Sequence, residues 1–326
     1  MGSERVTVVI PNWNGLAHLE ECILALRAQT FQDFRTIVID NASSDESVSW
    51  LHAHAPDVEV VVMPRNGGFG YAVNEGIRRA ATRYVALLNN DTAVDPEWLG
   101  ALVGALEERP EYSVAASCMV IYDQPDVVNA AGDVFDVLAL AGRNRGFMKP
   151  ASRYRSRTRV FGACAGAALY RRALFDDIGL FDEGFFLMSE DTEVSLRCLR
   201  AGHRCLYEPR ALVRHKVSSS TRRHGMTEVL RLGARNQTRA VAMSFPALLL
   251  PLAGMLWPVR LARFSVARGT RIGLPSLRSI GLAARLRADF EGFRLGVDAR
   301  SRHRVPDRVS ALTCLRWLVV GVGPAS

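Results

Sequence analysis

The sequence predicts an α/β protein with a mainly parallel sheet, and three observations indicate this fold class. Short, β-branched apolar runs alternate with helical patterns through the first third of the chain. The runs are mainly apolar, as in strands that are covered on both faces. Polar clusters follow their ends, where open sheets of this kind bind ligands. With 326 residues, 48% of them apolar, the chain is long enough for one large domain with an extension or for two modest domains.

Four strands and two helices are expected in the first part of the chain. The expected strands are VTVVI at 6–10, TIVID at 36–40, VEVVV at 58–62 and YVALL at 84–88. Residues 16–28 should form a helix, because their leucines and isoleucine recur on one face, and residues 47–54 should form another. Such alternation implies right-handed crossovers between parallel strands.

The next part of the chain has a weaker pattern. Residues 110–160 contain scattered glycines and the run RYRSRTR, and we expect a loop-rich insertion there. The run FGACAGAALY at 161–170 is small and apolar, which allows close packing. A helix is expected from Thr192 to Ala201, with a Glu193–Arg197 pair four residues apart and Gly202 as its C-terminal cap.

The six cysteines are scattered and include no CxxC pair or zinc-type spacing. A disulfide framework or a structural metal site is therefore not expected, and a reducing cytosol is the natural compartment. The N-terminus leads almost directly into VTVVI without a basic region followed by a long apolar core, so no signal peptide is expected.

Positive charge is concentrated in the C-terminal tail. Residues 260–326 hold 13 Arg, no Lys and four acids, a net charge of +9, so residues 1–259 carry −1 of the total +8. The tail follows an uncharged stretch from Ala240 to Val259, which three prolines interrupt. A basic segment beside an apolar one favours an anionic membrane surface over nucleic acid, with a solvated basic extension as the alternative. We expect the apolar stretch to be interfacial or re-entrant rather than a simple spanning helix.

The stretch LLNNDT at 87–92 places three oxygen-bearing side chains, Asn89, Asn90 and Asp91, at the end of an apolar strand. One interpretation is a turn before the helix start DPEW. The other is that Asp91 ligates a hard divalent cation whose remaining positions are filled by phosphate oxygens and water. Two further clusters are ambiguous: DNASSD at 40–45 is also a common helix cap, and PRNGGFG matches neither a P-loop nor a dinucleotide fingerprint.

The stretch SED at 189–191 places Glu190 and Asp191 at a predicted helix start. Acids there often only complement the helix dipole. Here they follow FDEGFF, whose aromatics can form a pocket wall, and a carboxylate in such a pocket can remove a proton from an attacking hydroxyl. His215 ends the apolar run ALV, so it is either a core or surface histidine or a metal ligand.

These clusters together resemble glycosyltransferase family 2, especially its rhamnosyltransferase-like branch, over residues 5–240. The resemblance rests on an ordered set of motifs: VVIPNWNG, VIDNASSD, NGGFGYAVNEGI, LLNNDT, GACAGAALYRRALFDDIGLFDEGFF, SEDTEVSLRCLRAG and HKVSSS. It implies a GT-A type nucleotide-binding sheet in residues 1–110, fused to an acceptor-binding half in residues 111–240. Residues 241–326 would form a helical, basic, membrane-associating extension.

The resemblance also implies roles for particular residues. The nucleotide-sugar donor would be bound by Pro11, Asn12, Asn14, Asp40, Asn41, Ser43, Asn66, Gly68, Asn74, Asn89 and Asn90. Asp91 would ligate Mg²⁺ or Mn²⁺, with His215 as a second ligand, and Asp191 would be the catalytic base beside Glu190. Asn89 takes the place of the first carboxylate of the family's DxD motif, which predicts weak metal affinity, and Ser189 stands where glycine is common.

The expected reaction is an inverting transfer from a nucleoside-diphosphate sugar to a hydroxyl of a glycan or polyprenyl-linked acceptor in bacterial cell-surface polysaccharide synthesis. Rhamnose is the expected sugar, with glucosyl, galactosyl and N-acetylhexosaminyl donors as alternatives. The expected location is the cytoplasmic face of the cell membrane, without nucleic acid as a partner. Two other interpretations are a catalytically inactive binding protein of the same fold and a membrane-associated scaffold.

Overall fold

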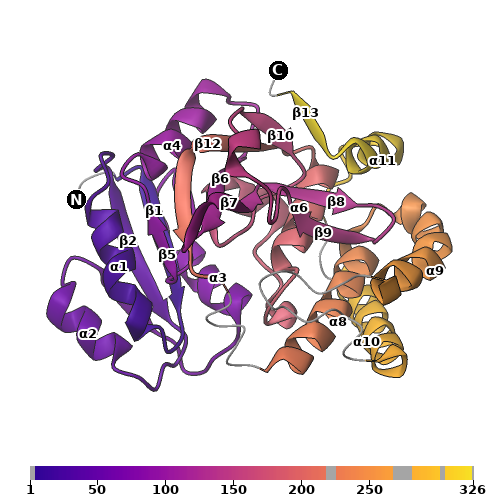
Figure 1. Cartoon of the computed structure of the whole chain (residues 1–326), viewed down its shortest axis with the longest axis horizontal. Coiled ribbons are helices and arrows are strands. Elements are labelled where there is room, and N and C mark those ends of the chain that lie inside the picture. Colours follow the sequence, from indigo (N-terminus) through magenta and orange to yellow (C-terminus); the bar gives the residue numbers. More distant parts are fainter. Residues whose placement is uncertain (1–3, 218–224, 267–280, 302–304, 325–326) are drawn as a thin grey trace.

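The computed structural model describes residues 4–217, 225–266, 281–301 and 305–324. The serines of HKVSSS and part of the arginine-rich tail lie outside these ranges. A central sheet separates helices α1 (Leu16–Arg27) and α2 (Ser47–His54) at one end of the molecule from a group of C-terminal helices at the other (Figure 1).

Four parallel strands form the N-terminal part of the sheet, in the order β3-β2-β1-β4. They are β1 (Val6–Asn12), β2 (Phe34–Asp40), β3 (Glu59–Val62) and β4 (Tyr84–Leu88), connected through α1, α2 and α3 (Phe69–Arg79). The four predicted strands and both predicted helices are confirmed. Because these strands run in one direction, their carboxyl ends lie at the same edge, where Asn12 is in register with Asp40.

Beyond β4 the sheet is mixed, in the order β4-β11-β6-β12-β10-β13. These strands are β6 (Val114–Ile121), β10 (Thr158–Val160), β11 (Ala167–Arg171), β12 (Cys205–His215) and β13 (Val322–Pro324). Only β6 and β12 are parallel neighbours in this part. The short strand β5 (Thr92–Val94) pairs with β12, and β7 (Gln124–Ala131) pairs with β6. The C-terminal strand β13 therefore returns to the sheet.

The expectation of a loop-rich insertion at 110–160 is wrong for much of that segment. It contains β6, β7 and a hairpin of β8 (Asp133–Asp136) and β9 (Ala141–Asn144). The strand β6 is buried along its length, whereas β7 and β9 are partly exposed. Partly exposed strands carry no continuous apolar run, so their pattern in the sequence is weak.

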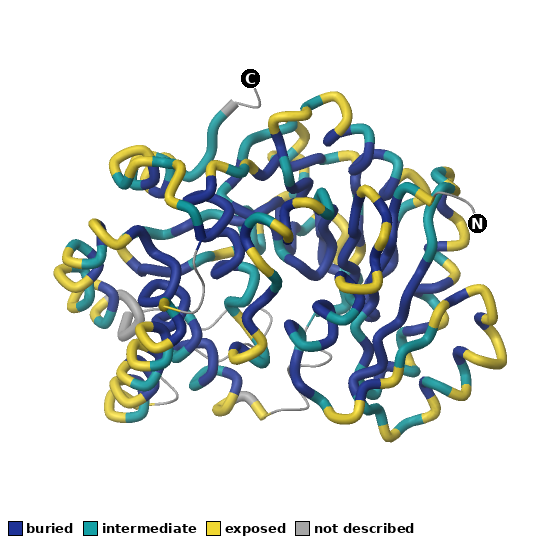
Figure 2. The backbone as a smooth tube through the Cα atoms, turned by 180° about the vertical axis from the view of Figure 1, so that it is seen from behind, coloured by how far each residue is buried: buried dark blue, intermediate teal, exposed yellow. Residues whose placement is uncertain are grey.

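Apolar cores fill both faces of the sheet, one of them including α1 and α4 (Trp98–Glu108), the other α3, α5 (Ala173–Ile178) and α6 (Glu190–Ala201). In α6 the predicted Glu193–Arg197 pair is confirmed at 2.6 Å and is fully buried. Gly202 caps this helix with a φ of +85°, as predicted. Strands β1, β2 and β4 are mostly buried, whereas β3 at the edge of the sheet is partly exposed (Figure 2).

The described part of the C-terminal region contains the helices α8 (Met226–Ser244), α9 (Leu250–Val266), α10 (Leu282–Arg300) and α11 (Ala311–Val320). The uncharged stretch at 240–259 is divided between the end of α8, a 3-10 turn at Ala247–Leu249 and α9. Within the described ranges, no helix combines the length and apolarity needed to cross a membrane.

Candidate active site

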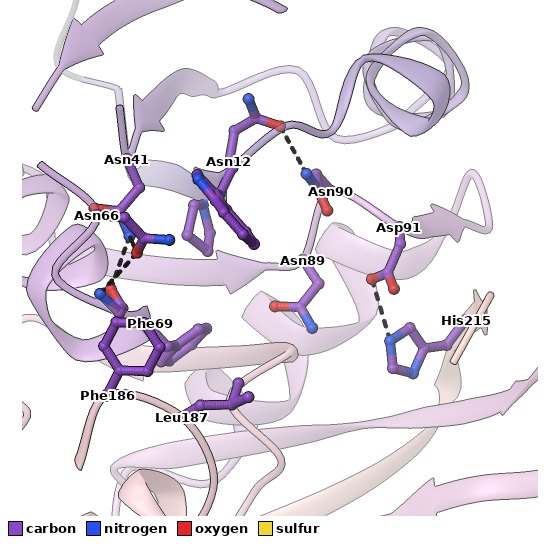
Figure 3. A pocket seen from close by; sticks show the side chains of 13 residues that line it. Asn12, Asn41, Asn66, Phe69, Asn89, Asn90, Asp91, Phe186, Leu187 and His215 are labelled. Atoms are coloured by element: carbon purple, nitrogen blue, oxygen red, sulfur yellow. Dashed lines mark hydrogen bonds and ion pairs between the residues drawn. The ribbon is translucent and has the colours of Figure 1, made fainter. Parts of the chain in front are cut away.

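A pocket of about 180 Å³ opens at the carboxyl edge of the parallel strands (Figure 3). Strand ends, the start of α3 and the segment before α6 all contribute to it. The lining residues are Pro11, Asn12, Trp13, Asn41, Asn66, Gly68, Phe69, Asn89, Asn90, Asp91, Phe186, Leu187 and His215. The structure thus brings together most of the residues that were predicted to bind the donor and both predicted metal ligands.

Asn12, at the end of β1, organises one side of the pocket. Its Nδ2 donates to Asp40 Oδ1 at 2.9 Å, and its Oδ1 accepts from Asn90 Nδ2 at 2.7 Å. Asp40 Oδ2 in turn accepts from the backbone N–H of Ser43 at 2.9 Å. A side chain on Gly15 would collide with Asn12 and Asn90, which explains the glycine of PNWNG. The ends of β1, β2 and β4 are therefore connected by one hydrogen-bonded network.

Asn41 and Asn66 shape the loop that leads into α3. Asn41 Nδ2 donates to Asn66 Oδ1 and to the carbonyl oxygen of Gly68, both at 3.0 Å. Its Oδ1 accepts from the Gly67 N–H at 3.1 Å. Gly68 has a φ of +87°, and a side chain there would collide with the Phe186 carbonyl. This turn requires glycine for its backbone conformation and for its close approach to the segment before α6.

Four residues that were predicted to bind the donor support the pocket without lining it: Asn14, Asp40, Ser43 and Asn74. Asn14 Oδ1 accepts from the Ser44 N–H at 2.7 Å, so it holds the loop after β2. Asn74 is buried in α3, where its Nδ2 donates to the Phe181 carbonyl at 2.9 Å and to Glu183 at 3.0 Å. The structure therefore places Asn74 as an anchor for the chain before α6.

Asp91 and His215 lie side by side in the pocket (Figure 3). His215 Nε2 is 3.2 Å from Asp91 Oδ1, and its Nδ1 is 3.0 Å from Oδ1 of Asn129, a buried residue of β7 that the sequence did not indicate. Since Asn129 accepts the Nδ1–H, the ring presents Nε2 toward Asp91. The pairing of β5 with β12 sets His215 opposite Thr92, the neighbour of Asp91. Two predicted ligands that lie far apart in sequence therefore meet.

The opposite wall is aromatic and apolar, formed by Trp13, Phe69, Phe186 and Leu187. The Phe69 N–H donates to the Phe186 carbonyl at 2.8 Å, so the start of α3 is joined to the segment before α6. Phe186 belongs to FDEGFF, the stretch whose aromatics were expected to form a pocket wall. Trp13 and Phe69 fall inside motifs that were recognised for their polar and glycine residues.

The segment Phe186–Ser189, called here the pre-α6 loop, has a strained backbone. Phe186, Met188 and Ser189 have φ angles of +61°, +71° and +69°. Residues other than glycine seldom adopt this conformation, and each instance costs about 1–3 kcal/mol unless the surroundings hold it. Such strain concentrates at functional sites.

Asn236 of α8 holds the pre-α6 loop in place. Its fully buried Nδ2 donates to the carbonyl oxygens of Phe185, Leu187 and Met188 at 2.8, 2.7 and 3.0 Å. Arg239, one turn further along α8, bonds Asp182 at 2.7 Å. The C-terminal region therefore fixes the geometry of one pocket wall.

Glu190 and Asp191 begin α6 directly after this loop, and both are half-buried. The backbone amide of Ala165 lies near Asp191 and favours its ionised form. The next residue, Gly166, accepts from the N–H of Asn89 at 2.8 Å, so Asp191 lies one backbone segment away from the pocket wall. Burial, with the adjacent charge of Asp191, raises the pKa of Glu190 to about 8. Burial also raises the pKa of Asp191, opposed first by the hydrogen bond from the Thr192 backbone.

Asp133, at the start of β8, is a third carboxyl near this pair that the sequence did not reveal. It is buried, and its Oδ1 has no hydrogen-bond partner among the described residues. Burial, and then the charge of Asp191, raise the pKa of Asp133. Neighbouring carboxyls disfavour one another's ionisation, so the charge of Asp191 favours the protonated forms of Glu190 and Asp133.

Residues 7–179 match the model of glycosyl transferase family 2. A pre-mycofactocin glycosyltransferase of Mycobacterium tuberculosis is 30% identical over 212 residues, which cover 64% of this chain and 42% of that protein. The O-antigen biosynthesis protein RfbC of Myxococcus xanthus is 28% identical over 240 residues, 70% of this chain and 18% of that protein. The chain thus spans about two fifths or less of the length of these relatives.

Solved structures resemble the whole chain at low identity. The mannosyltransferase PcManGT from Pyrobaculum calidifontis, in complex with GDP-Man and Mn²⁺, has a TM-score of 0.55 and 16% identity over 97% of this chain and 87% of that chain. GalNAc-T7 with UDP, GalNAc and Mn²⁺ has a TM-score of 0.61 and 16% identity over 91% of this chain and 56% of that chain. These likenesses concern the fold.

Proposed function

Because the chain belongs to glycosyl transferase family 2, we propose that it transfers a sugar from a nucleoside-diphosphate sugar to a hydroxyl of a glycan or lipid-linked acceptor. The predicted GT-A type α/β fold with a helical C-terminal region is confirmed. One observation supports the proposal: the Asp91–His215 pair lines a pocket at the carboxyl edge of the parallel strands, whereas Asp191 lies outside that lining.

The donor occupies the pocket in this proposal. Trp13 offers an aromatic face on which a nucleobase can stack, and Asn41 and Asn66 form the polar edge beside it. The sugar diphosphate then extends toward Asp91 and His215. Solved structures of the same fold contain GDP-Man or UDP, which supports a nucleotide-sugar donor here.

The residues present fit a divalent cation that is completed by its substrate. Asp91 and His215 offer one carboxylate and one imidazole nitrogen 3.2 Å apart, with Asn129 orienting the ring. Among the described residues no group of three or more such side chains occurs, so phosphate oxygens and water would supply the other ligands, as Mg²⁺ prefers at nucleotide sites. When bound, the ion neutralises negative charge on the diphosphate.

Asp191 acts as the base in the proposed reaction. The acceptor O–H proton passes to its carboxylate while the acceptor oxygen bonds to the anomeric carbon. The bond from that carbon to the diphosphate breaks, and the nucleoside diphosphate leaves with the electron pair. This single displacement inverts the configuration of the sugar and requires no covalent enzyme intermediate. Glu190, whose pKa lies near 8, stays protonated beside the base at neutral pH.

The sugar, the acceptor, the location and the domain bounds are proposed from the sequence. We favour rhamnose as the sugar and a polyprenyl-linked acceptor in bacterial cell-surface polysaccharide synthesis, at the cytoplasmic face of an anionic membrane. The name of the Myxococcus relative supports polysaccharide synthesis.

Residues 1–240 would form the transferase domain, with the acceptor half from residue 111, and residues 241–326 would form an extension. That extension packs against the domain through α10 and β13.

A panel of nucleotide sugars tests the proposal. Thermal shift identifies the donor, because a ligand that binds only the native state raises the melting temperature. Release of nucleoside diphosphate with that donor then separates a transferase from an inactive binding protein or a scaffold. Binding without any release, alone or with acceptor lipid, would support the inactive protein instead.

Glu190→Gln should increase thermal stability in alkaline solution. The pKa of Glu190 rises from 4.5 to about 8 on folding, so the stabilisation that its proton supplies is complete below pH 4.5 and is lost as pH rises through about 8. The neutral variant avoids that loss. It should melt at least about 2 °C above wild type near pH 9 and close to wild type near pH 5. Glu228→Gln is the matched control, since that exposed first-turn acid has a lowered pKa through Arg231 and should show no alkaline gain.

Asn236→Leu should lower kcat by about tenfold to a hundredfold, because it removes the donor that holds the pre-α6 loop ahead of Asp191. Donor affinity should also fall, since Phe186 and Leu187 line the pocket. Thr238→Val is the control: it deletes an equally buried hydrogen bond, from α8 to Asp289, without touching the loop. Equal losses of kcat in the two variants would make Asn236 merely structural.

A further inference from the structure

Helix α10 packs against the protein through its smallest residues. Ala288, Gly292, Gly296 and Ala299 are buried, and a side chain on Gly292 or Gly296 would collide with the backbone of α8 at Arg235 or Arg239. The small residues on the inner face of α10 therefore allow it to pack closely against α8. Buried Asp289, paired with Arg285 at 2.9 Å and with Arg260 of α9 at 3.3 Å, joins the helices further.

The large apolar residues of α10 point outward. Leu282, Leu286, Phe290, Phe293 and Val297 are between 43% and 71% exposed. Their spacings of four, four, three and four residues confine them to a stripe about 80° wide on the helix. They are called here the α10 stripe. A helix on a soluble protein normally has the reverse arrangement, with its large apolar residues facing the core.

Helix α9 also exposes apolar side chains. On α9, Met255 is 78% exposed and Val259 is also exposed, and the outer residues around them carry no charge. Figure 1 shows α9 and α10 together at the end of the molecule away from α1 and α2. Large apolar side chains that are exposed in this number mark an interaction site.

Cationic side chains border the α10 stripe. Arg287 and Arg294 are exposed along one edge, where Asp298 is the single exposed acid of the helix. Residues 260–326 carry a net charge of +9 in total. Apolar side chains flanked by arginines are complementary to a bilayer with anionic headgroups, in which a helix lies along the interface.

We infer that the α10 stripe is the surface by which this protein docks on an anionic lipid membrane, with α10 lying in the plane of the interface. The choice of a membrane as partner rests on the proposed function, which gives the enzyme a lipid-linked acceptor. The docked helix contacts α8, and α8 holds the pre-α6 loop through Asn236. One helix therefore separates the docking surface from the wall of the active-site pocket.

Cosedimentation with vesicles tests the inference. The full chain should bind vesicles of phosphatidylglycerol and phosphatidylcholine at low salt and bind pure phosphatidylcholine much less. The double variant Phe290→Ser with Phe293→Ser should bind the anionic vesicles at least about tenfold more weakly, because both rings leave the interface. Arg287→Gln with Arg294→Gln should weaken binding and flatten its salt dependence.

Leu24→Ser with Val62→Ser is the matched control, since both residues are apolar and more than half exposed, on α1 and β3 in the N-terminal part of the protein. It should bind vesicles as wild type does. All variants should keep the melting temperature of wild type and the thermal shift that the donor induces. If no nucleotide sugar shifts the melting temperature of wild type, that result contradicts the proposed function but not membrane docking. The inference is overturned if wild type ignores anionic vesicles, if the serine variant binds them equally well, or if light scattering shows a dimer that the serine variant dissociates.

Discussion

Asp191→Asn should lower kcat for glycosyl transfer by about a hundredfold to ten-thousandfold, the usual range for loss of a general base. The amide keeps the shape of the side chain and can retain the hydrogen bond from the Thr192 N–H, which now stands at 2.7 Å. Donor affinity should stay nearly unchanged, because the donor pocket is lined mainly by the ends of the N-terminal strands. Transfer rates and donor titrations of the same preparation measure the two effects separately.

Glu190→Gln is the comparison that assigns the base. Consecutive helical residues project about 100° apart, so the two carboxyls cannot face the same acceptor hydroxyl. The glutamine resembles the protonated Glu190 expected at neutral pH, and its transfer rate should therefore fall much less than that of Asp191→Asn. A severe defect in Glu190→Gln beside a nearly active Asp191→Asn would reverse the assignment. Equal loss of donor binding in both variants would make the pair structural.

The parallel half of the structure could be predicted because its signals are local. Each strand there is a mainly apolar run, and the polar residues at its end fall at a sheet edge that all these strands share. Asn12, Asp40 and Asn90 stand at separate places in the sequence, yet chain direction alone brings them to one edge, where they bond one another. The sheet edge was therefore predictable without knowledge of any contact.

The remaining features depend on contacts that leave no local pattern. Asn129 orients His215 from a partly exposed strand, and Asn236 holds the pre-α6 loop from a helix more than forty residues further along the chain. A lone asparagine in a strand or a helix carries no signal of its partner. The outward stripe of α10 is equally hidden, because small and large residues alternate around the helix and only the packing reveals which face is covered.

Asn74 shows that a motif can identify an important residue without revealing its role. The resemblance predicted that it lines the donor site, but both of its side-chain atoms bond the Phe181 backbone in the interior. A motif shows that a residue matters to the site without showing whether it touches a ligand or positions a neighbour. Asn14 and Ser43 likewise stabilise the loop after β2.

Asp91→Asn should reduce transfer by about a hundredfold or more, since a bound divalent ion contributes several kcal/mol of charge stabilisation to a departing diphosphate. The variant is nearly isosteric, and the backbone carbonyl of Asp91 still accepts from the Lys216 N–H at 3.0 Å. The fold should therefore remain intact. Excess chelator should reduce wild-type activity to a similar level, and added Mn²⁺ or Mg²⁺ should restore it for wild type only.

Asp95→Asn is the matched control for this experiment. Asp95 lies four residues further along the chain, after β5 and outside the pocket lining, where its carboxylate accepts from the Glu97 N–H. Direct Mn²⁺ binding in the presence of nucleoside diphosphate supplies a readout that does not depend on turnover. Wild type and Asp95→Asn should bind the ion, and Asp91→Asn should bind it far more weakly, because a lone His215 remains. If Asp91→Asn turns over normally, or if wild type works in excess chelator, then Asn89, Asn90 and Asp91 form only the turn that follows β4.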